Sequence, residues 1–322
     1  MKIIVTGNQG FIGYWLSKHL SQQGHTVVGI DNLSSFGERQ SCNDSEYKIF
    51  HQLVSDLCEP SSWVPYANQF EPDVVLHLAA QAILPRCYRN PVETVSNNIT
   101  STQNVLEFCN ASESVKSLVC VTSDKVYENL GKGTHFNEED RLGGKDAYSL
   151  SKTTCEFLCK SYHLTHRKNK ELSIQTARLG NVVGGGDWSV DRLIPDLMRS
   201  ITNDQEFYIR YIEATRPFQH VSDVVVGLTN LFEHGLTSRG IHDCWNIGPR
   251  DNSSCSVEAV INLTKKHFGD FRIVQSEDIY KEDLLLAVDN SKYANKFGHP
   301  EYDSLTSIDL ALGWYLGYGG QL

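Results

Sequence analysis

Short apolar runs alternate with helical patterns along the first half of the chain. Residues 3–6 form a β-branched run, and Ile12, Leu16 and Leu20 then repeat at the spacing of a helix face. The same alternation continues as far as residue 179. It predicts strands at 3–6, 26–31, 48–53, 74–79, 118–122 and 173–179, and helices at 11–20, 91–108 and 147–163.

Strands that alternate with helices form crossover units, which build a parallel sheet covered on both faces. The near-continuous apolar character of these runs fits burial on both sides. The alternation stops after Leu179, and three consecutive glycines follow at 184–186. We expect an α/β protein with a Rossmann-type doubly wound parallel sheet in residues 1–180. Residues 181–322 would form a smaller mixed α/β lobe, with segments at about 220–250 returning to the first domain.

The composition is that of an ordinary globular protein, with 40% hydrophobic and 21% charged residues. Lys and Arg number 29 against 39 Asp and Glu, which gives a formal net charge of −10. This negative charge disfavours binding to nucleic acid or to an anionic membrane surface. An anionic ligand would therefore have to be held by local Arg, Lys and backbone N–H groups.

Nine cysteines are present, an odd number without any C-x-x-C pair. Their spacing supports neither a disulfide framework nor a zinc site, so we expect free thiols in a reducing cytoplasm and no metal. No run of about 18 apolar residues exists, so no membrane span is predicted. The chain opens directly with a predicted strand, which leaves no room for a signal peptide.

A glycine-rich loop lies between the first predicted strand and the first predicted helix. Gly7, Gly10 and Gly13 allow a tight turn and a close backbone approach to a pyrophosphate at the helix start. Asp31 ends the second strand, 18 residues beyond Gly13, where a carboxylate binds an adenosine ribose and disfavours a 2′-phosphate. A purely structural turn is the alternative. The pattern predicts an NAD site formed by Gly7, Gly10, Phe11, Ile12, Gly13, Asp31 and Asn32.

Two later segments would extend the same site. Asp56 and Leu57 follow the third predicted strand, near the expected position of an adenine. Leu78, Ala79 and Ala80 end the fourth strand, and their small side chains let the backbone pass close to a ligand. Each segment could equally be an ordinary loop.

Tyr148 and Lys152 are four residues apart in a helical pattern, so their side chains share one helix face. A phenol has a pKa of about 10, which a nearby ammonium and an oxidised nicotinamide would lower. The phenolate could then take a hydroxyl proton during hydride transfer. Chance supplies about one Tyr-x-x-x-Lys in a chain of this length. The evidence for a catalytic role therefore comes from the position of the pair on the helix after the fifth strand. The alternative is that Tyr148 and Lys152 are ordinary surface residues.

These motifs together resemble the extended short-chain dehydrogenase/reductase family over essentially the whole chain. The resemblance implies bound NAD, a nucleotide-sugar substrate, and a homodimer formed through a four-helix bundle. It also implies that Asn98, Tyr148 and Lys152 contribute to cofactor binding. The matching residues are Gly7-x-x-Gly10-x-x-Gly13, 31–35, 77–80, Asn98, and Tyr148 with Lys152.

The fifth predicted strand is followed by Ser123, Asp124 and Lys125, at the sheet edge where such folds bind ligands. A dehydrogenase or 4-epimerase needs only the Tyr–Lys pair and a hydroxyl such as that of Ser123. An additional acid and base would also permit elimination, because a ketone at sugar C4 acidifies the C5 proton. The base, Lys125, would then have to be neutral, and the acid would protonate the departing C6 hydroxyl.

The geometry after Ser123 decides whether this elimination is possible. Successive side chains on a strand point to opposite faces of the sheet. Asp124 and Lys125 can therefore reach one sugar only if the chain turns just after Ser123. An exposed ion pair, which contributes little free energy, is the alternative.

Candidate substrate-binding residues lie mostly in the second half of the chain. Arg192, Arg210 and Arg216 could bind a diphosphate in this acidic protein, with solvated surface arginines as the alternative. Gln81, which follows the fourth strand, is a further candidate for contact with substrate. Trp188 could line a sugar or base pocket or pack in the core.

The segments around these residues closely resemble CDP-glucose 4,6-dehydratases. This resemblance implies that Asp124 is the acid, that Lys125 is the base, and that Asn181 and the three arginines hold a nucleotide diphosphate. Val126 and Phe218 depart from the family pattern, where Cys and Trp are usual. The matching segments are 122–125, 143–149, 178–196, 209–221 and 245–250.

The sequence therefore favours a nucleotide-sugar 4,6-dehydratase that retains NAD. A nucleotide-sugar 4-epimerase or a simple dehydrogenase is the second interpretation, and the Asp124–Lys125 pair argues against it. A non-catalytic NAD sensor on the same fold is a third, and the presence of both Tyr148 and Lys152 argues against that.

Overall fold

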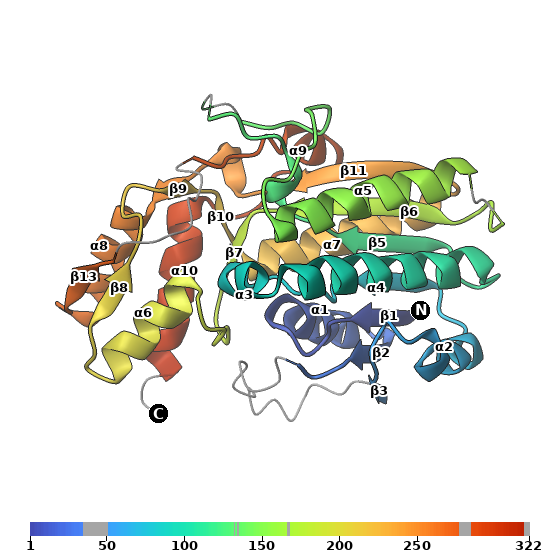
Figure 1. Ribbon diagram of the computed structural model, residues 1–322, viewed down its shortest axis with the longest axis horizontal. Helices are drawn as coiled ribbons and strands as arrows, with labels where there is room; N and C mark the ends of the chain where they lie inside the picture. The colour runs from blue at the N-terminus through green and yellow to red at the C-terminus, as the bar shows by residue number, and fades with distance from the viewer. Residues whose placement is uncertain (35–50, 132, 134, 166–167, 277–284, 319–322) are drawn as a thin grey trace.

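A computed structural model describes residues 1–34, 51–131, 133, 135–165, 168–276 and 285–318. A seven-stranded sheet forms the centre of the molecule (Figure 1). All its neighbouring strands are parallel, in the order β11-β6-β5-β4-β1-β2-β3. The order reverses between β1 and β4, so their carboxyl ends flank the crevice where such sheets bind ligands. The strands are β1 (Lys2–Thr6), β2 (Thr26–Asp31), β3 (His51–Val54), β4 (Val74–His77), β5 (Ser117–Val121), β6 (Ser173–Leu179) and β11 (His242–Ile247).

Helices cover both faces of this sheet, which confirms the predicted α/β fold. Ile3 and Val5 of β1 pack with the helices of one face, and Ile4 packs with those of the other. This alternation follows from the pleat and explains why the strands are apolar throughout. The first face carries α1 (Phe11–Gln22), α7 (Val221–Thr237) and α9 (Ser291–Phe297); the second carries α2 (Val64–Phe70), α4 (Pro91–Ala111) and α5 (Ala147–Thr165), with α3 (Leu84–Arg89) near α4 and α5.

A smaller lobe of mixed α/β structure lies beside the carboxyl ends of the strands (Figure 1). It has its own apolar core, in which Leu197, Val260 and Leu312 are fully buried. The helix α7 and the strand β11 come from residues beyond 180 but belong to the large sheet. The lobe contains β7 (Asn181–Val183) paired with β10 (Phe218–His220), β8 (Phe207–Ile209) with β13 (Ile273–Gln275), β9 (Thr215–Arg216) with β12 (Cys255–Ser256), and the helices α6 (Leu193–Thr202), α8 (Val257–Phe268) and α10 (Ser304–Tyr318).

Several element boundaries differ from those that the periodicity predicts. The fourth strand ends at His77, two residues early, because the chain leaves the ladder beside β1. The fifth strand ends at Val121, so Thr122 already lies outside it. Residues 48–50 of the predicted third strand, like Ser35 and Cys42, lie outside the described residues. The division into domains at residue 180 stays a prediction.

The described part of the chain contains eight cysteines, and all of them are free thiols. Within it, no group of three or more His, Cys, Asp or Glu side chains could hold a metal ion. No helix among the described residues is long and apolar enough to cross a membrane.

Candidate functional site

The glycine loop connects β1 to α1 at the carboxyl edge of the sheet. Gly7 has a φ of +69°, and a Cβ there would lie 2.7 Å from the backbone nitrogen of Ala79. A Cβ at Gly13 would collide with the carbonyl oxygen of Gly7. No side chain caps the start of α1 at Gly10, so its first N–H groups remain available to an anion. The loop thus forms a cradle that leaves no room for a side chain at Gly7 or Gly13.

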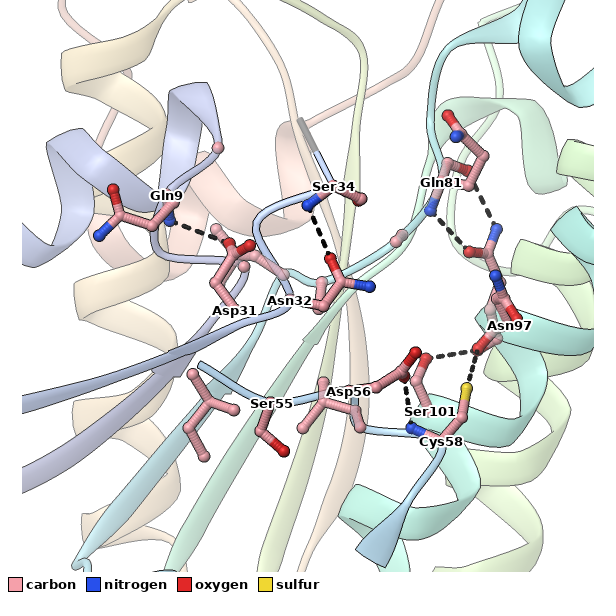
Figure 2. A pocket seen from close by; sticks show the side chains of 18 of the residues that line it. Gln9, Asp31, Asn32, Ser34, Ser55, Asp56, Cys58, Gln81, Asn97 and Ser101 are labelled. Carbon is pink, nitrogen blue, oxygen red and sulfur yellow. Dashed lines mark hydrogen bonds between the residues drawn. The ribbon is translucent and has the colours of Figure 1, made fainter. Parts of the chain in front are cut away.

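Asp31, at the end of β2, faces the same loop (Figure 2). Its carboxylate accepts the backbone N–H of Gln9 at 3.1 Å and that of Leu33 at 2.7 Å. Gln52 of β3 accepts hydrogen bonds from the side chains of Asn8 and Gln9, which ties the loop to the sheet edge. The carboxylate is therefore held in place at the wall of a cavity.

This first cavity runs along the carboxyl ends of β1, β2 and β4. Asn98 of α4 fixes one side of it, because its side chain accepts the Gln81 N–H at 2.8 Å and donates to Ser151 of α5 at 2.9 Å. The structure brings most of the predicted cofactor residues together here. They are Gly7, Gly10, Asp31, Asn32, Asp56, Leu57, Leu78, Ala79, Ala80 and Asn98.

A second cavity adjoins the first and shares its glycine wall. Tyr148 and Lys152 of α5 line it, and the Lys152 ammonium donates to the carbonyl oxygen of Val121 at 2.9 Å. Phe11, Ile12 and Gly13, from the start of α1, also line this cavity, as does Gln81.

The chain turns immediately after Ser123, which is the condition that elimination requires. The 3₁₀ helix η3 (Asp124–Val126) begins there, and the Ser123 Oγ caps it by accepting the Lys125 N–H at 3.2 Å. Because this turn interrupts the strand alternation, Asp124 and Lys125 both line the second cavity with Tyr148. The structure therefore gathers all five predicted catalytic residues around one space.

Burial sets the electrostatics of this cavity. Asp124 is 3% exposed, and burial raises the pKa of its carboxyl to about 6 although Lys125 counteracts this. Its Oδ1 accepts the Ser123 hydroxyl at 3.1 Å, while its Oδ2 is buried without a hydrogen-bond partner among the described residues. Burial also raises the pKa of the Tyr148 phenol, which Lys152 and Ser123 lower only in part. The lowering expected from the sequence included the charge of an oxidised nicotinamide, so it stays a prediction for the protein with NAD bound.

A third cavity continues from the second into the smaller lobe. Asn181 and Arg192 line both, and Arg210 and Arg216 line the third. Arg216 is buried on β9. The three arginines outnumber the two carboxylates of the same cavity, those of Asp191 and Asp196, so this acidic protein has a local excess of positive charge there. Phe218 is buried at the same cavity.

Trp188 packs edge-on against Tyr315 at 5.2 Å, so it belongs to the core of the smaller lobe. Asp187 and Ser189, its neighbours, line the second cavity and were not predicted. They lie in the 178–196 segment, where only Asn181 and Arg192 were selected as ligands. Gln9, within the glycine motif, also lines the first cavity. That cavity adds further residues that no sequence motif indicated, since separate elements bring them together: Ser55, Cys58, Arg86, Asn97 and Ser101.

Comparisons with known proteins agree with these motifs. The model of the "NAD dependent epimerase/dehydratase family" matches residues 3–248. A CDP-glucose 4,6-dehydratase from Salmonella typhimurium is 31% identical over 330 aligned residues, which cover 98% of this chain and 90% of that protein.

Two solved structures show the same fold. The UDP-glucose 4-epimerase of Thermus thermophilus, in complex with NAD, gives a TM-score of 0.85 at 20% identity and covers 98% of this chain and 99% of that one. The dTDP-glucose 4,6-dehydratase of Bacillus anthracis, also in complex with NAD, gives 0.81 at 21% identity, with 98% and 96% covered.

Proposed function

Since the chain belongs to the NAD dependent epimerase/dehydratase family, we propose that it is a nucleotide-sugar 4,6-dehydratase and that CDP-glucose is its expected substrate. The observation that carries the proposal is the turn after Ser123, which directs Asp124 and Lys125 into the cavity of Tyr148 and Lys152. The Salmonella relative, similar over nearly its full length, supports the same reaction.

The residues present fit NAD. The glycine cradle and the uncapped start of α1 suit a pyrophosphate, and Asp31 suits the adenosine ribose. NAD supplies the oxidant for the C4 hydroxyl and, after water loss, the reductant for C6, so it is regenerated in every turnover. Tyr148 and Lys152 line the adjoining cavity, where they would contact both the cofactor and the sugar.

The chain's own residues divide the proton transfers between two groups. Tyr148, as phenolate, takes the proton of the C4 hydroxyl, and the charge of Lys152 favours that ionised form. Ser123 lines the same cavity, and its hydroxyl, which donates to Asp124 in the free protein, would support the new C4 carbonyl by a hydrogen bond. Oxidation therefore depends chiefly on Tyr148 and Lys152 of α5, and Ser123 has a supporting role.

Asp124 and Lys125 then carry out the elimination. Lys125, acting as the base, removes the C5 proton, and protonated Asp124 gives its proton to the departing C6 hydroxyl, so the C5–H and C6–O bonds break, a C5=C6 double bond forms and one water leaves. Lys125 returns its proton to C5 when C6 is reduced. The raised pKa of Asp124, about 6, keeps part of this carboxyl protonated near neutral pH. Its Oδ2 has no hydrogen-bond partner among the described residues, so this oxygen can carry the proton.

The direct test is a substrate survey without added cofactor. Purified protein is incubated with CDP-glucose, UDP-glucose, dTDP-glucose, GDP-mannose and UDP-N-acetylglucosamine, and the products are weighed by mass spectrometry. A product lighter by one water is expected. An isomer of unchanged mass would instead support a 4-epimerase, and no turnover of any sugar would support an NAD sensor.

Asp31→Asn is expected to weaken NAD binding by about tenfold or more, because hydrogen bonds to a charged group contribute roughly 1.5–3 kcal/mol. The NAD content of the purified protein and titration calorimetry on stripped protein measure this. Asp270→Asn, at an exposed position far from the cavity, is the control. If both variants bind NAD with equal affinity, Asp31 does not contribute to NAD binding.

We further propose that two copies of the chain associate through α4 and α5, which lie side by side (Figure 1). Leu150, Phe157 and Leu164 are 48%, 55% and 64% exposed and recur every seven residues on α5, while Val92 on α4 is 81% exposed. Apolar residues at this spacing form one stripe, which a second copy would bury in a four-helix bundle.

Phe157→Asp is expected to convert this dimer into a monomer, because it places a charge at the centre of the apolar stripe. Light scattering during size-exclusion chromatography measures the mass. Leu305→Asp, at an exposed leucine of α10, is the matched control and should leave the mass unchanged. A wild-type protein that is already monomeric at micromolar concentration contradicts the proposal.

A further inference from the structure

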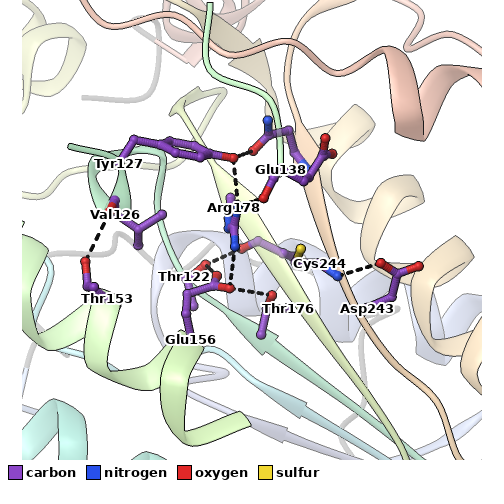
Figure 3. Close-up of polar contacts among 12 residues, drawn as sticks. Thr122, Val126, Tyr127, Glu138, Thr153, Glu156, Thr176, Arg178, Asp243 and Cys244 are labelled. Carbon is purple, nitrogen blue, oxygen red and sulfur yellow. Dashed lines mark hydrogen bonds and ion pairs between the residues drawn. The ribbon is translucent and has the colours of Figure 1, made fainter. Parts of the chain in front are cut away.

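A buried ion pair contacts Thr122, which lines the second cavity, and the proposed mechanism does not use this pair (Figure 3). Arg178 of β6 and Glu156 of α5 approach to 2.9 Å, and their side chains are only 4% and 3% exposed. Removing two charges from water is costly, so such a pair is stable only where further hydrogen bonds compensate it. The residues that form those hydrogen bonds show which parts of the chain the ion pair fixes in place.

Glu156 holds the start of the segment that carries the proposed acid and base. Its Oε1 accepts the Thr122 hydroxyl at 2.5 Å, and its Oε2 accepts the Thr176 hydroxyl at 2.9 Å. Thr122 immediately precedes Ser123, whereas Thr176 lies within β6. One carboxylate therefore joins α5, β6 and the first residue of this segment.

Arg178 holds the other end of the same segment. Its Nη1 donates to the Tyr127 hydroxyl at 2.9 Å, and that hydroxyl donates to the Asn246 Oδ1 at 2.6 Å. Tyr127 also stacks on Phe136, with ring centroids 5.0 Å apart. Tyr127 follows η3 directly, so the two members of the ion pair hold the two ends of residues 122–127, which we call the acid–base turn.

The same ion pair links the acid–base turn to the helix of the Tyr–Lys pair. Glu156 lies one helical turn after Lys152 and two after Tyr148, on the same face of α5. Thr153 of this helix also donates to the Val126 carbonyl oxygen at 3.2 Å. We propose that Arg178 and Glu156 are positioning residues that fix Asp124 and Lys125 relative to Tyr148; this inference rests on the proposed function.

Loosening the acid–base turn should impair elimination more than oxidation. The α5 helix has anchors of its own, since Lys152 binds the Val121 carbonyl and Ser151 binds Asn98. Asp124 has no comparable anchor, because its Oδ2 is unpartnered among the described residues and the hydrogen bonds to its carboxyl come from its neighbours in the turn, Ser123 and Lys125. Its placement therefore depends on the backbone of the turn. A displacement of about 1 Å can cost roughly 10²-fold in rate.

The test removes single hydroxyls and leaves the ion pair intact, because breaking it with Glu156→Gln would leave a buried unpaired charge that threatens folding. Thr122→Val removes the bond from Glu156 to the turn. Thr176→Val is the matched control, since it removes the other hydroxyl bond to the same carboxylate, from a residue that lies within β6 and is not part of the turn. Tyr127→Phe loosens the other end and keeps the aromatic ring.

Two rates are measured in single turnovers with CDP-glucose: reduction of bound NAD by near-ultraviolet absorbance, and formation of the dehydrated product by mass spectrometry. For Thr122→Val and Tyr127→Phe we expect the rate of dehydration to fall by roughly 10-fold or more, while KM stays unchanged. NAD reduction should stay within about threefold of wild type. Thr176→Val should keep the wild-type ratio of the two rates, with a melting temperature like that of Thr122→Val.

The reaction of the wild-type protein distinguishes a failure of this inference from a failure of the proposed function. If it releases a dehydrated sugar and Thr122→Val keeps the same rate ratio as Thr176→Val, the pair is merely structural and the inference is wrong. If the wild type forms only an isomer or an oxidised sugar, the proposed function fails and takes this inference with it.

Discussion

Asp124→Asn is expected to lower the rate of dehydration by about 10²–10⁴-fold, the usual contribution of a positioned acid. The amide retains the shape of the carboxyl and an oxygen for the Ser123 hydroxyl, but it cannot give a proton to the departing C6 hydroxyl. Oxidation at C4 does not need this proton. Bound NAD should therefore still be reduced on addition of substrate, and the reduced form should accumulate.

Absorbance of the reduced cofactor and mass spectrometry of the released sugar follow the two events in one sample. Asp270→Asn, the exposed aspartate already used as a control, should match wild type in both. If Asp124→Asn dehydrates the substrate at the wild-type rate, Asp124 is not the acid.

Tyr148→Phe is expected to slow both the reduction of bound NAD and the dehydration of the substrate, each by about 10²–10⁴-fold. Removing the hydroxyl leaves no group on α5 to accept the C4 proton, since Lys152 remains bonded to the Val121 carbonyl. Without a C4 ketone the C5 proton is not acidic, so the intact Asp124 and Lys125 have nothing to act on. No reduced cofactor should accumulate.

Tyr162→Phe is the matched control on the same helix. Tyr162 bonds Glu107 at 2.5 Å and does not line the second cavity, so its variant should oxidise and dehydrate as wild type does. Reduction of NAD by Tyr148→Phe at the normal rate would falsify the role of the phenol as the first base. The contrast between the Asp124 and Tyr148 variants therefore assigns each group to one step.

Much of the fold could be predicted from local patterns. The β-branched run of β1 and the helical spacing of Ile12, Leu16 and Leu20 placed the first strand and helix within one or two residues. The strand at Ser173–Leu179 matches its prediction at both ends. Short elements such as α3 were missed, because six residues are too few for an amphipathic period to stand out.

Much of the candidate site also carried a local signal, but not the part that decides the chemistry. The glycine loop and the Tyr148–Lys152 spacing are motifs within single segments. The alternation of a strand would separate Asp124 from Lys125, and only the structure shows the chain turning at Ser123. Residues from separate elements, such as Ser55 and Arg86, joined the first cavity without any motif.

The sequence by itself determined the parallel α/β sheet, the nucleotide loop and the pairing of a phenol with an ammonium, because each depends on residues close together in the chain. The tertiary structure decided that Asp124 is buried with a raised pKa, that Arg192, Arg210 and Arg216 converge, and that Glu156 meets Arg178. Desolvation and such contacts arise only when distant segments pack against one another, and no local pattern encodes that packing.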